Sequence, residues 1–506
     1  MKLRETLLME RVRDREAYQK VTDAFRRRRN GATIADIVAK TALPLRTVRE
    51  LVPIAADEYS ARLEVTESGE ILYSFPHGFV SKYRGFRAGL RKAGEKIKKG
   101  IKVAASWVFK VWIMVMLVGY FVLFMLIALA ALLLSVAASS SSNDRSSRRG
   151  DGGGIYMASG IFNLIIRIWF YSELFKPVAP YYRGRGTPSP ARPKSRPLHK
   201  AIFSFVFGDG DPNADWPVRE KQAVIAYIQA NSGVISLPEL MSLTGLPPDK
   251  AESRITAYCA EFGGLPEATE DGTVVYRFDD LLLRADTRDR SFPGLSGPVK
   301  RLKSFSSNEN KMNVWFSLIN GANLVFGSYF LYNAMNTGAI LTQADFNASS
   351  FLYGILYVLL SHIAANPLPV IISALGLVPL IFSLLFWLVP SLRFVLNRRD
   401  NKAVKLENFR KNAYSRIWDD PLAVKPQDIV PQAKECRPQN LAATQDRVIK
   451  EIGVYANPDV SLDETGKPVY VFGELEREKA ALEKYRAGIA PGASDLGKIV
   501  FDSGRE

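Results

Sequence analysis

Residues 104–138 form an apolar stretch of 35 residues that contains a single charged side chain, Lys110. A helix of about 20 apolar residues crosses a bilayer, so this stretch is long enough to span one. It follows about 100 largely polar residues, whereas a secretory signal peptide is N-terminal and shorter. The sequence therefore predicts an integral membrane protein whose polar blocks are domains attached to the membrane.

The composition places an excess of positive charge beside the apolar segments. The chain has 67 Lys and Arg against 51 Asp and Glu, a net charge of +16. This clustering favours an anionic membrane surface over nucleic acid as the partner. Two distant cysteines (Cys259 and Cys436) and three separated histidines provide neither a disulfide framework nor the ligands of a zinc or iron–sulfur site. We therefore expect no cofactor.

Alternation between apolar and charged stretches divides the chain into segments. The soluble blocks are residues 1–76, 201–297 and 392–506, the last with a C-terminal helix. Further membrane segments are predicted at 312–336 and at 349–391, which is long enough for a transmembrane hairpin or for one span and a re-entrant helix. Residues 155–175 predict either another span or an interfacial aromatic helix. The connecting segments are a basic juxtamembrane segment (77–103), a flexible loop (139–154) and a basic linker rich in Pro and Arg (176–200).

Basic residues flank each membrane region on the side of the soluble blocks, in the runs 82–102, 176–200, 300–303 and 393–402. Lys and Arg are enriched on the cytoplasmic side of membrane proteins. All three blocks are therefore expected to face the cytoplasm from a bacterial inner membrane, or the same side of a plastid-type membrane. An even number of crossings must then separate successive blocks. We expect 155–175 to cross back or dip in, and one piece of 312–391 to be re-entrant or half-spanning.

The three soluble blocks repeat one pattern: two helices, an acidic turn with glycine, and an alternating Tyr-x-Phe strand. The helices are predicted at 34–38 and 44–56, at 237–241 and 247–262, and at 426–430 and 442–455. The turns and strands contain Gly69 with Tyr73 and Phe75, Gly272 with Tyr276 and Phe278, and Gly466 with Tyr470 and Phe472. Glycine tolerates positive φ at a hairpin tip, and alternation puts Tyr and Phe on one face of the strand.

A first helix at 13–29, at 219–232 and within 403–420 completes the element order of a winged helix-turn-helix. The predicted fold class is α+β: a multi-pass α-helical membrane protein with three winged-helix-like repeats. Such folds often place a basic helix on DNA. Only the first repeat offers basic residues there, Arg46 and Arg49, whereas the helices of the other two are near neutral. Nucleic acid is therefore not the expected partner, and a protein-interaction role is favoured.

The run 82–102, which precedes the first membrane helix, contains one acidic residue, Glu95. Basic clusters beside a membrane helix bind anionic lipid headgroups, although they also simply fix orientation. The residues predicted to contact headgroups are Arg84, Arg87, Arg91, Lys92, Lys96, Lys98 and Lys99.

Residues 203–213 read FSFVFGDGDPN, the most distinctive short string in the chain. Alternate oxygen-bearing side chains follow, as in a calcium loop of the EF-hand type. The candidate ligands are Asp209, Asp211, Asn213, Asp215 and Glu220. The sixth position of such a loop is Gly, but here it is Ala214. We therefore favour the alternative, an Asp-rich turn that caps a helix starting near Pro217.

At this string the chain resembles a group of membrane proteins from cyanobacteria and plant plastids. In plants these proteins are often labelled "iron-sulfur cluster biosynthesis family protein". The similarity lies in residues 203–213, in the hairpin at 276–278, and in Tyr73-Ser74-Phe75-Pro76 followed by a basic run. It implies a membrane location, with no established activity or site residues. The label itself finds no support in a chain with two distant cysteines.

No nucleophile–base pair, phosphate loop or metal cluster is recognisable in the sequence, so we do not expect an enzyme. The predicted function is a membrane-anchored scaffold, with homo-oligomers as one form of assembly. A membrane-tethered DNA-binding regulator and a channel or transporter are the alternatives. His362 and Asn366, beside two prolines in an apolar region, are the candidate pathway residues.

Overall fold

The computed structural model describes residues 14–26, 31–76, 78–79, 81–82, 100–101, 103–140, 196–285, 295, 297–341, 349–431, 433–489 and 496–504. The chain forms two compact units. The globular unit comprises Met1–Gly94, Asp211–Lys303 and Arg399–Glu506, and the spanning unit comprises Glu95–Gly210 and Ser304–Arg398. The predicted headgroup residues between 84 and 99, and the predicted helix 155–175, lie outside the described residues.

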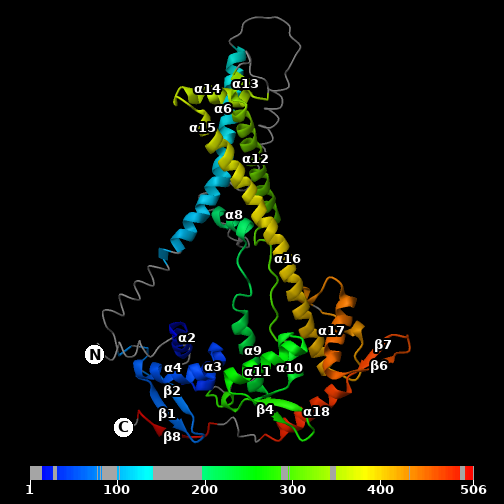
Figure 1. Ribbon diagram of the computed structural model, residues 1–506. Helices are drawn as coiled ribbons and strands as arrows, with labels where there is room; N and C mark the ends of the chain where they lie inside the picture. The colour runs from blue at the N-terminus through cyan, green and yellow to red at the C-terminus, as the bar shows by residue number, and fades with distance from the viewer. Residues whose placement is uncertain are drawn as a thin grey trace, which may run out of the picture. The chain divides into compact units, whose positions relative to one another are not determined.

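Among its described residues, the spanning unit has three helices that are long and apolar enough to cross a membrane: Val103–Leu134, Asn310–Met335 and the start of Leu368–Asp419. The first contains a π-helical turn, η1 (Val115–Gly119), followed by α6 (Tyr120–Ser140). The second is α12 (Asn310–Met335). The third runs through α15 (Leu368–Val370), the π-helical η4 (Ile371–Leu377) and α16 (Val378–Asp419). Figure 1 shows α6, α12 and α16 side by side in this unit.

Three shorter helices accompany the long ones: α8 (Leu198–Phe207), α13 (Thr337–Leu341) and α14 (Phe351–Ser361). The 11 residues of α14 give about 16 Å of helix, roughly half of a bilayer core. The stretch 349–391 therefore contains one half-length helix and the start of one long helix. Aromatic rings fill contacts between these helices: Phe124 of α6 stacks on Phe330 of α12, and Phe205 of α8 stacks on Phe386 of α16.

In the globular unit, block 1 contains α2 (Arg15–Arg26), α3 (Ile34–Thr41), α4 (Leu45–Glu58), β1 (Arg62–Thr66) and β2 (Ile71–Ser74). Block 2 contains α9 (Trp216–Ala230), β3 (Val234–Ile235), α10 (Leu237–Thr244), α11 (Pro248–Phe262), β4 (Leu265–Ala268), β5 (Val274–Arg277) and η3 (Asp279–Leu281). Block 3 contains the end of α16, η5 (Pro426–Asp428), η6 (Lys434–Cys436), α17 (Leu441–Ala456), β6 (Asp459–Leu462), β7 (Pro468–Val471) and α18 (Gly473–Ala487).

The three predicted hairpins are confirmed. The antiparallel pairs are β1 with β2, β4 with β5, and β6 with β7, and the turn glycines Gly69, Gly272 and Gly466 have φ of 84°, 80° and 75°. Tyr73, Phe278 and Phe472 are buried against the helices, as alternation predicts. One prediction was wrong: residues 426–430 of block 3 form the short 3-10 turn η5 in place of a helix.

Local sequence explains the short helices α3 and α10. Each begins with a capping box, Thr33 with Asp36 and Ser236 with Glu239, in which the two residues satisfy each other's backbone donors. Each ends at a residue in the left-handed conformation, Ala42 in block 1 and Gly245 in block 2. The two blocks therefore use the same local signals to turn from the short helix into the longer one.

One continuous cluster of buried side chains runs through all three blocks. Polar contacts also join them: Arg49 donates to Asp280, and Ala285 donates its backbone N–H to the buried Asp36. The chain end adds the strand β8 (Ile499–Asp502) to block 1, giving a sheet of order β2-β1-β8. Figure 1 shows β8, in red, beside the blue hairpin of block 1.

Candidate functional site

The Asp-rich motif follows α8, and its first aspartate belongs to the spanning unit. Asp209 accepts hydrogen bonds from the Ser204 hydroxyl and the Ser307 backbone N–H, both at 2.8 Å, and lies 3.0 Å from Arg196. Partial burial favours the neutral acid, but these hydrogen bonds outweigh it and lower the pKa of Asp209 to about 2. Asp209 is therefore ionised at neutral pH and fixes the residues that precede α12.

In the globular unit, three asparagines hold an extended segment, residues 297–303, that we call the strap. Asn213 donates to the Arg301 carbonyl and accepts from its N–H, at 2.8 and 2.9 Å. Asn408 does the same for Lys300, and Asn401 for Lys303. A side-chain amide that donates and accepts in this way replaces a neighbouring strand, so the strap is fixed without belonging to a sheet.

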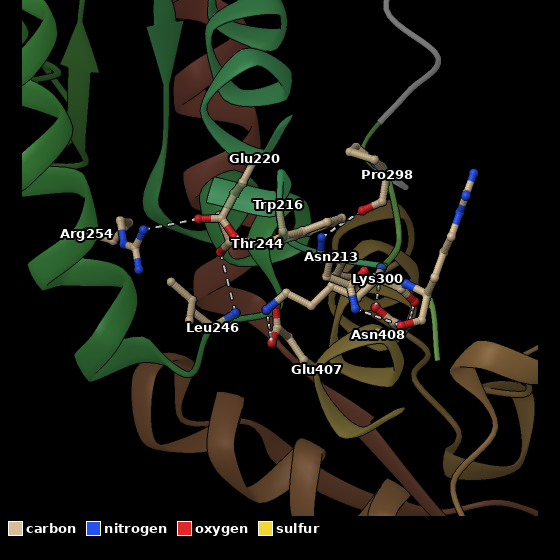
Figure 2. Close-up of polar contacts among 12 residues, drawn as sticks. Asn213, Trp216, Glu220, Thr244, Leu246, Arg254, Pro298, Lys300, Glu407 and Asn408 are labelled. Atoms are coloured by element: carbon tan, nitrogen blue, oxygen red, sulfur yellow. Dashed lines mark hydrogen bonds and ion pairs between the residues drawn. The ribbon is translucent and has the colours of Figure 1, made fainter. Parts of the chain in front are cut away.

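Cations surround Trp216, the first residue of α9. Its ring centroid lies 4.4 Å from Lys411 Nζ and 5.3 Å from Lys300 Nζ, and its indole N–H donates to Glu220 at 2.9 Å. Such cation–π contacts strengthen when water is excluded. Figure 2 shows Trp216 between Glu220 on one side and Pro298 and Lys300 of the strap on the other. The ring is therefore the centre around which α9, the strap and α16 meet.

Lys411 lies in the part of α16 that belongs to the globular unit, beyond the charged run 398–400. It is 1% exposed, and its ammonium donates to the Pro298 carbonyl at 2.9 Å. Burial lowers the pKa of Lys411 to about 8, against the opposing influence of Glu407. Glu407 itself pairs with Lys300 at 2.6 Å. The buried ammonium of Lys411 is therefore surrounded by residues that also bind one another.

The calcium loop is the less favoured interpretation of the Asp-rich motif. Within the described residues, no group of three or more His, Cys, Asp or Glu side chains is placed to hold a metal ion. Glu220 accepts instead from Trp216, Tyr258 and Arg254. The favoured alternative predicted an Asp-rich turn that caps the next helix. The turn is present, but the predicted cap is not formed. Helix α9 begins at Trp216 after Asp215, which makes no side-chain capping bond and lies 4.0 Å from Arg219.

The two candidate pathway residues lie on the exposed connection after α14. His362 Nδ1 is 2.7 Å from the Val358 carbonyl, and Asn366 accepts from the Leu368 N–H. Both side chains are exposed and hydrogen-bonded to nearby backbone, as in helix-end and turn motifs. The structure does not bring them together with other polar groups in a buried site of the described residues.

Two amides within the long helices do face buried positions. Asn320 of α12 donates to the Ser383 carbonyl of α16 at 3.0 Å. Asn323 donates at 2.8 Å to the carbonyl of Leu117, which lies in the π-helical turn η1. A π-helical turn disturbs the helical ladder, so a buried side-chain donor is well matched to such a carbonyl. These bonds join the three long helices to one another.

Sequence reasoning missed the residues of α16 that hold the strap. Asn401, Asn408 and Lys411 are separated by seven and three positions, which places them on one face of a helix. This polar stripe, running down a helix that continues from an apolar segment, was the available signal. Its partner, the strap, has no recognisable pattern of its own.

Comparison with known proteins shows one distant relationship. The chain is 23% identical over 398 residues to an uncharacterized chloroplastic protein of Arabidopsis thaliana, covering 77% of this chain and 70% of that protein. The chain therefore has a distant homologue in plant chloroplasts. No family model matches it, and no solved structure matches it.

Proposed function

We propose that this protein is a membrane-anchored scaffold without catalytic activity, in which three winged-helix-like repeats form one platform for protein partners. The packing of three blocks, far apart in sequence, around one core supports this proposal best. Membrane anchoring alone does not require three blocks separated by two membrane regions. Packing the blocks together creates a composite surface that no single block provides.

The order of elements supports the winged-helix assignment of the repeats. In blocks 1 and 2 a helix, a short strand or bridge, a short helix, a longer helix and a hairpin follow one another. In block 3 the end of α16 is the first helix, and η5 replaces the short helix. Tyr73, Tyr276 and Tyr470 each pair with the extended residue that follows the first helix.

A shared core also supports placing all three blocks on one side of the membrane. Two long apolar helices, α12 and α16, separate blocks 2 and 3, which is an even number of crossings. Blocks 1 and 2 are separated by the helix Val103–Leu134, so this topology needs a second crossing, for which 155–175 is the sequence candidate. The basic flanks favour the cytoplasmic side of an inner membrane, or the same side of a plastid-type membrane, with anionic headgroups at Arg84 to Lys99.

The observations favour the scaffold over the two alternatives. In block 1, Arg49 of the helix α4 binds Asp280 of block 2, which draws it away from phosphate, whereas Arg46 makes only an exposed pair with Glu50. The buried amides Asn320 and Asn323 bond to helix carbonyls, which is the usual role of such residues in helix packing.

The proposal is tested on the full-length protein in native membranes. The expected result is retention in the pellet after a carbonate wash, together with defined protein partners that remain through a mild-detergent purification and cross-link to the globular unit. Protease from the cytoplasmic side should cut all three blocks, and protease from the opposite side none. Recovery without stoichiometric partners, or a block cut only from the opposite side, would contradict the proposal.

A further inference from the structure

The hairpins of blocks 1 and 3 turn the same backbone groups toward their outer edge. Tyr73 exchanges both backbone hydrogen bonds with Ala32, and Tyr470 does so with Val424. Leu63 lies opposite Tyr73, and Val460 lies opposite Tyr470. Each is therefore a non-hydrogen-bonded pair, in which the two opposed residues direct their N–H and C=O groups away from each other. Leu63 and Val460 therefore present a donor and an acceptor on the free side of β1 and of β6.

In block 1 this free side is occupied by an added strand. β8 pairs antiparallel with β1, with Glu64 opposite Asp502 and Val65 opposite Phe501. The Ser503 N–H donates to the Leu63 carbonyl at 3.0 Å. Arg62 donates to Asp502 through Nε, at 2.7 Å, and through Nη2. The outer edge of this hairpin is thus able to accept an extended segment, and a charge pair helps to fix its register.

In block 2 the same edge is closed to strand addition. Pro266 of β4 lies opposite Tyr276, in the place held by Leu63 in block 1. Proline has no N–H to donate, and natural proteins use it to blunt exposed edges. The Tyr485 hydroxyl of α18 also donates to Glu267, the next residue of β4.

In block 3 the edge is neither covered by another described strand nor interrupted by proline. Here β6 pairs with β7 and with no other described strand, and its four residues are all exposed. The exposed fractions of Val460 and Leu462 are 60% and 71%. Asp459 takes the register position that Arg62 has in block 1, one residue before the position opposite the tyrosine. The charge that would meet an incoming strand is therefore reversed.

We propose that the outer edge of β6 binds an extended segment of a protein partner by strand addition. The segment has apolar side chains at alternate positions and a Lys or Arg beside Asp459, where β8 carries Asp502. This inference deepens the proposed scaffold function and rests on it. Exposed apolar side chains on an open edge provide the main-chain and side-chain contacts that strand addition uses. The acidic residue selects among the extended segments that would otherwise fit.

The experiment uses the full-length protein in detergent and two fluorescent peptides. One has the sequence of residues 498–504, Lys-Ile-Val-Phe-Asp-Ser-Gly, and the other has Lys in place of its Asp. Fluorescence anisotropy should show the Lys peptide binding about two- to fivefold more tightly, as expected for one partly exposed ion pair. Asp459→Arg should reverse this preference. Asp446→Arg, with the same change of charge on α17, should leave it unchanged.

Val460→Pro removes the outward N–H and should weaken both peptides at least tenfold. Because this change also disturbs the hairpin, the reversal by Asp459→Arg is the deciding measurement. Equal binding of the two peptides, unaffected by Asp459→Arg, would overturn the inference. So would a dimer by mass photometry that Val460→Pro converts to monomer, because the occupant would then be a second copy. If protein partners persist through the membrane purification but neither peptide binds, the inference about the β6 edge is rejected and the scaffold proposal stands. If a peptide binds but no protein partners are recovered, the scaffold proposal is rejected.

Discussion

The buried pair between Arg486 of α18 and Glu239 of α10 offers the sharpest test of how the globular unit is held together. Arg486 donates to both carboxylate oxygens, at 2.9 and 2.8 Å, and to the Val234 carbonyl at 2.8 Å. The Glu239 side chain is 2% exposed, and it also accepts from the Tyr227 hydroxyl and the Ser236 N–H. Arg486→Met keeps most of the apolar volume but leaves a buried carboxylate without its cation.

Removing one partner of a buried ion pair costs about 3–5 kcal/mol. Two donors, Tyr227 and Ser236, stay with Glu239, so we expect Arg486→Met to lower the free energy of unfolding by about 3 kcal/mol, the low end of that range. Urea denaturation of the full-length protein in detergent, followed by tryptophan fluorescence, measures this change. Adding Glu239→Gln removes the stranded charge, so the double variant should be less destabilised than the two single changes summed, by about 2 kcal/mol.

The matched control lies two residues earlier on the same helix. Lys484 pairs with Glu270 at 3.0 Å, but both side chains are largely exposed. Lys484→Met should therefore leave the urea midpoint unchanged, because exposed pairs contribute little. If Arg486→Met behaves like Lys484→Met, or if Glu239→Gln restores nothing, then α18 does not depend on this pair and the reasoning is refuted.

Three further results are expected. Gly245→Ala should lower the thermal midpoint strongly, because a Cβ there meets the Glu407 carbonyl oxygen at 2.3 Å and φ is +70°; an unchanged midpoint would contradict the close approach of α10 and α16. Burial raises the pKa of Glu478 from 4.5 to about 7, so its contribution to stability is complete below pH 4.5 and lost as the pH rises through 7. Glu478→Gln should therefore be more stable than the wild type above pH 7 and lose that advantage below pH 4.5, whereas parallel pH profiles of the urea midpoint would exclude this assignment. Asn408→Leu should release the strap at Lys300 and speed hydrogen exchange there, whereas Asn397→Leu, a change outside the globular unit, should not alter exchange at Lys300.

The parts of the fold that sequence predicted are those set by neighbouring residues. Each hairpin needs a glycine at positive φ and an alternating strand, and both signals lie within ten residues of each other. The long apolar helices are equally local, because about 20 successive apolar residues determine them. These elements were predicted correctly in kind, and most ends are shifted by a few residues. The exception is α16, which continues without a break to Asp419, well past the predicted end at 391.

The parts that sequence did not predict depend on distant partners. β8 is a strand of four residues, three of them exposed, and its role comes from β1, more than 400 positions earlier in the chain. The strap likewise depends on Asn213, Asn401 and Asn408, which approach it from both directions along the sequence. Nothing in a short window distinguishes an asparagine that holds a backbone from one that faces solvent. The acidic motif was therefore noticed for its composition, while its partner segment was not.

The differences between the three hairpins say more about function than their shared pattern does. An open strand edge invites aggregation, and natural proteins cover it, charge it or interrupt it. This chain covers β1 with β8 and interrupts β4 with Pro266, whereas β6 has only Asp459. Pairing with a second copy of β6 offers that carboxylate no cation, since the strand reads Asp-Val-Ser-Leu. A segment with a basic residue at that position satisfies both the edge and the charge, which is why a different protein, and not a second copy, is the occupant we propose.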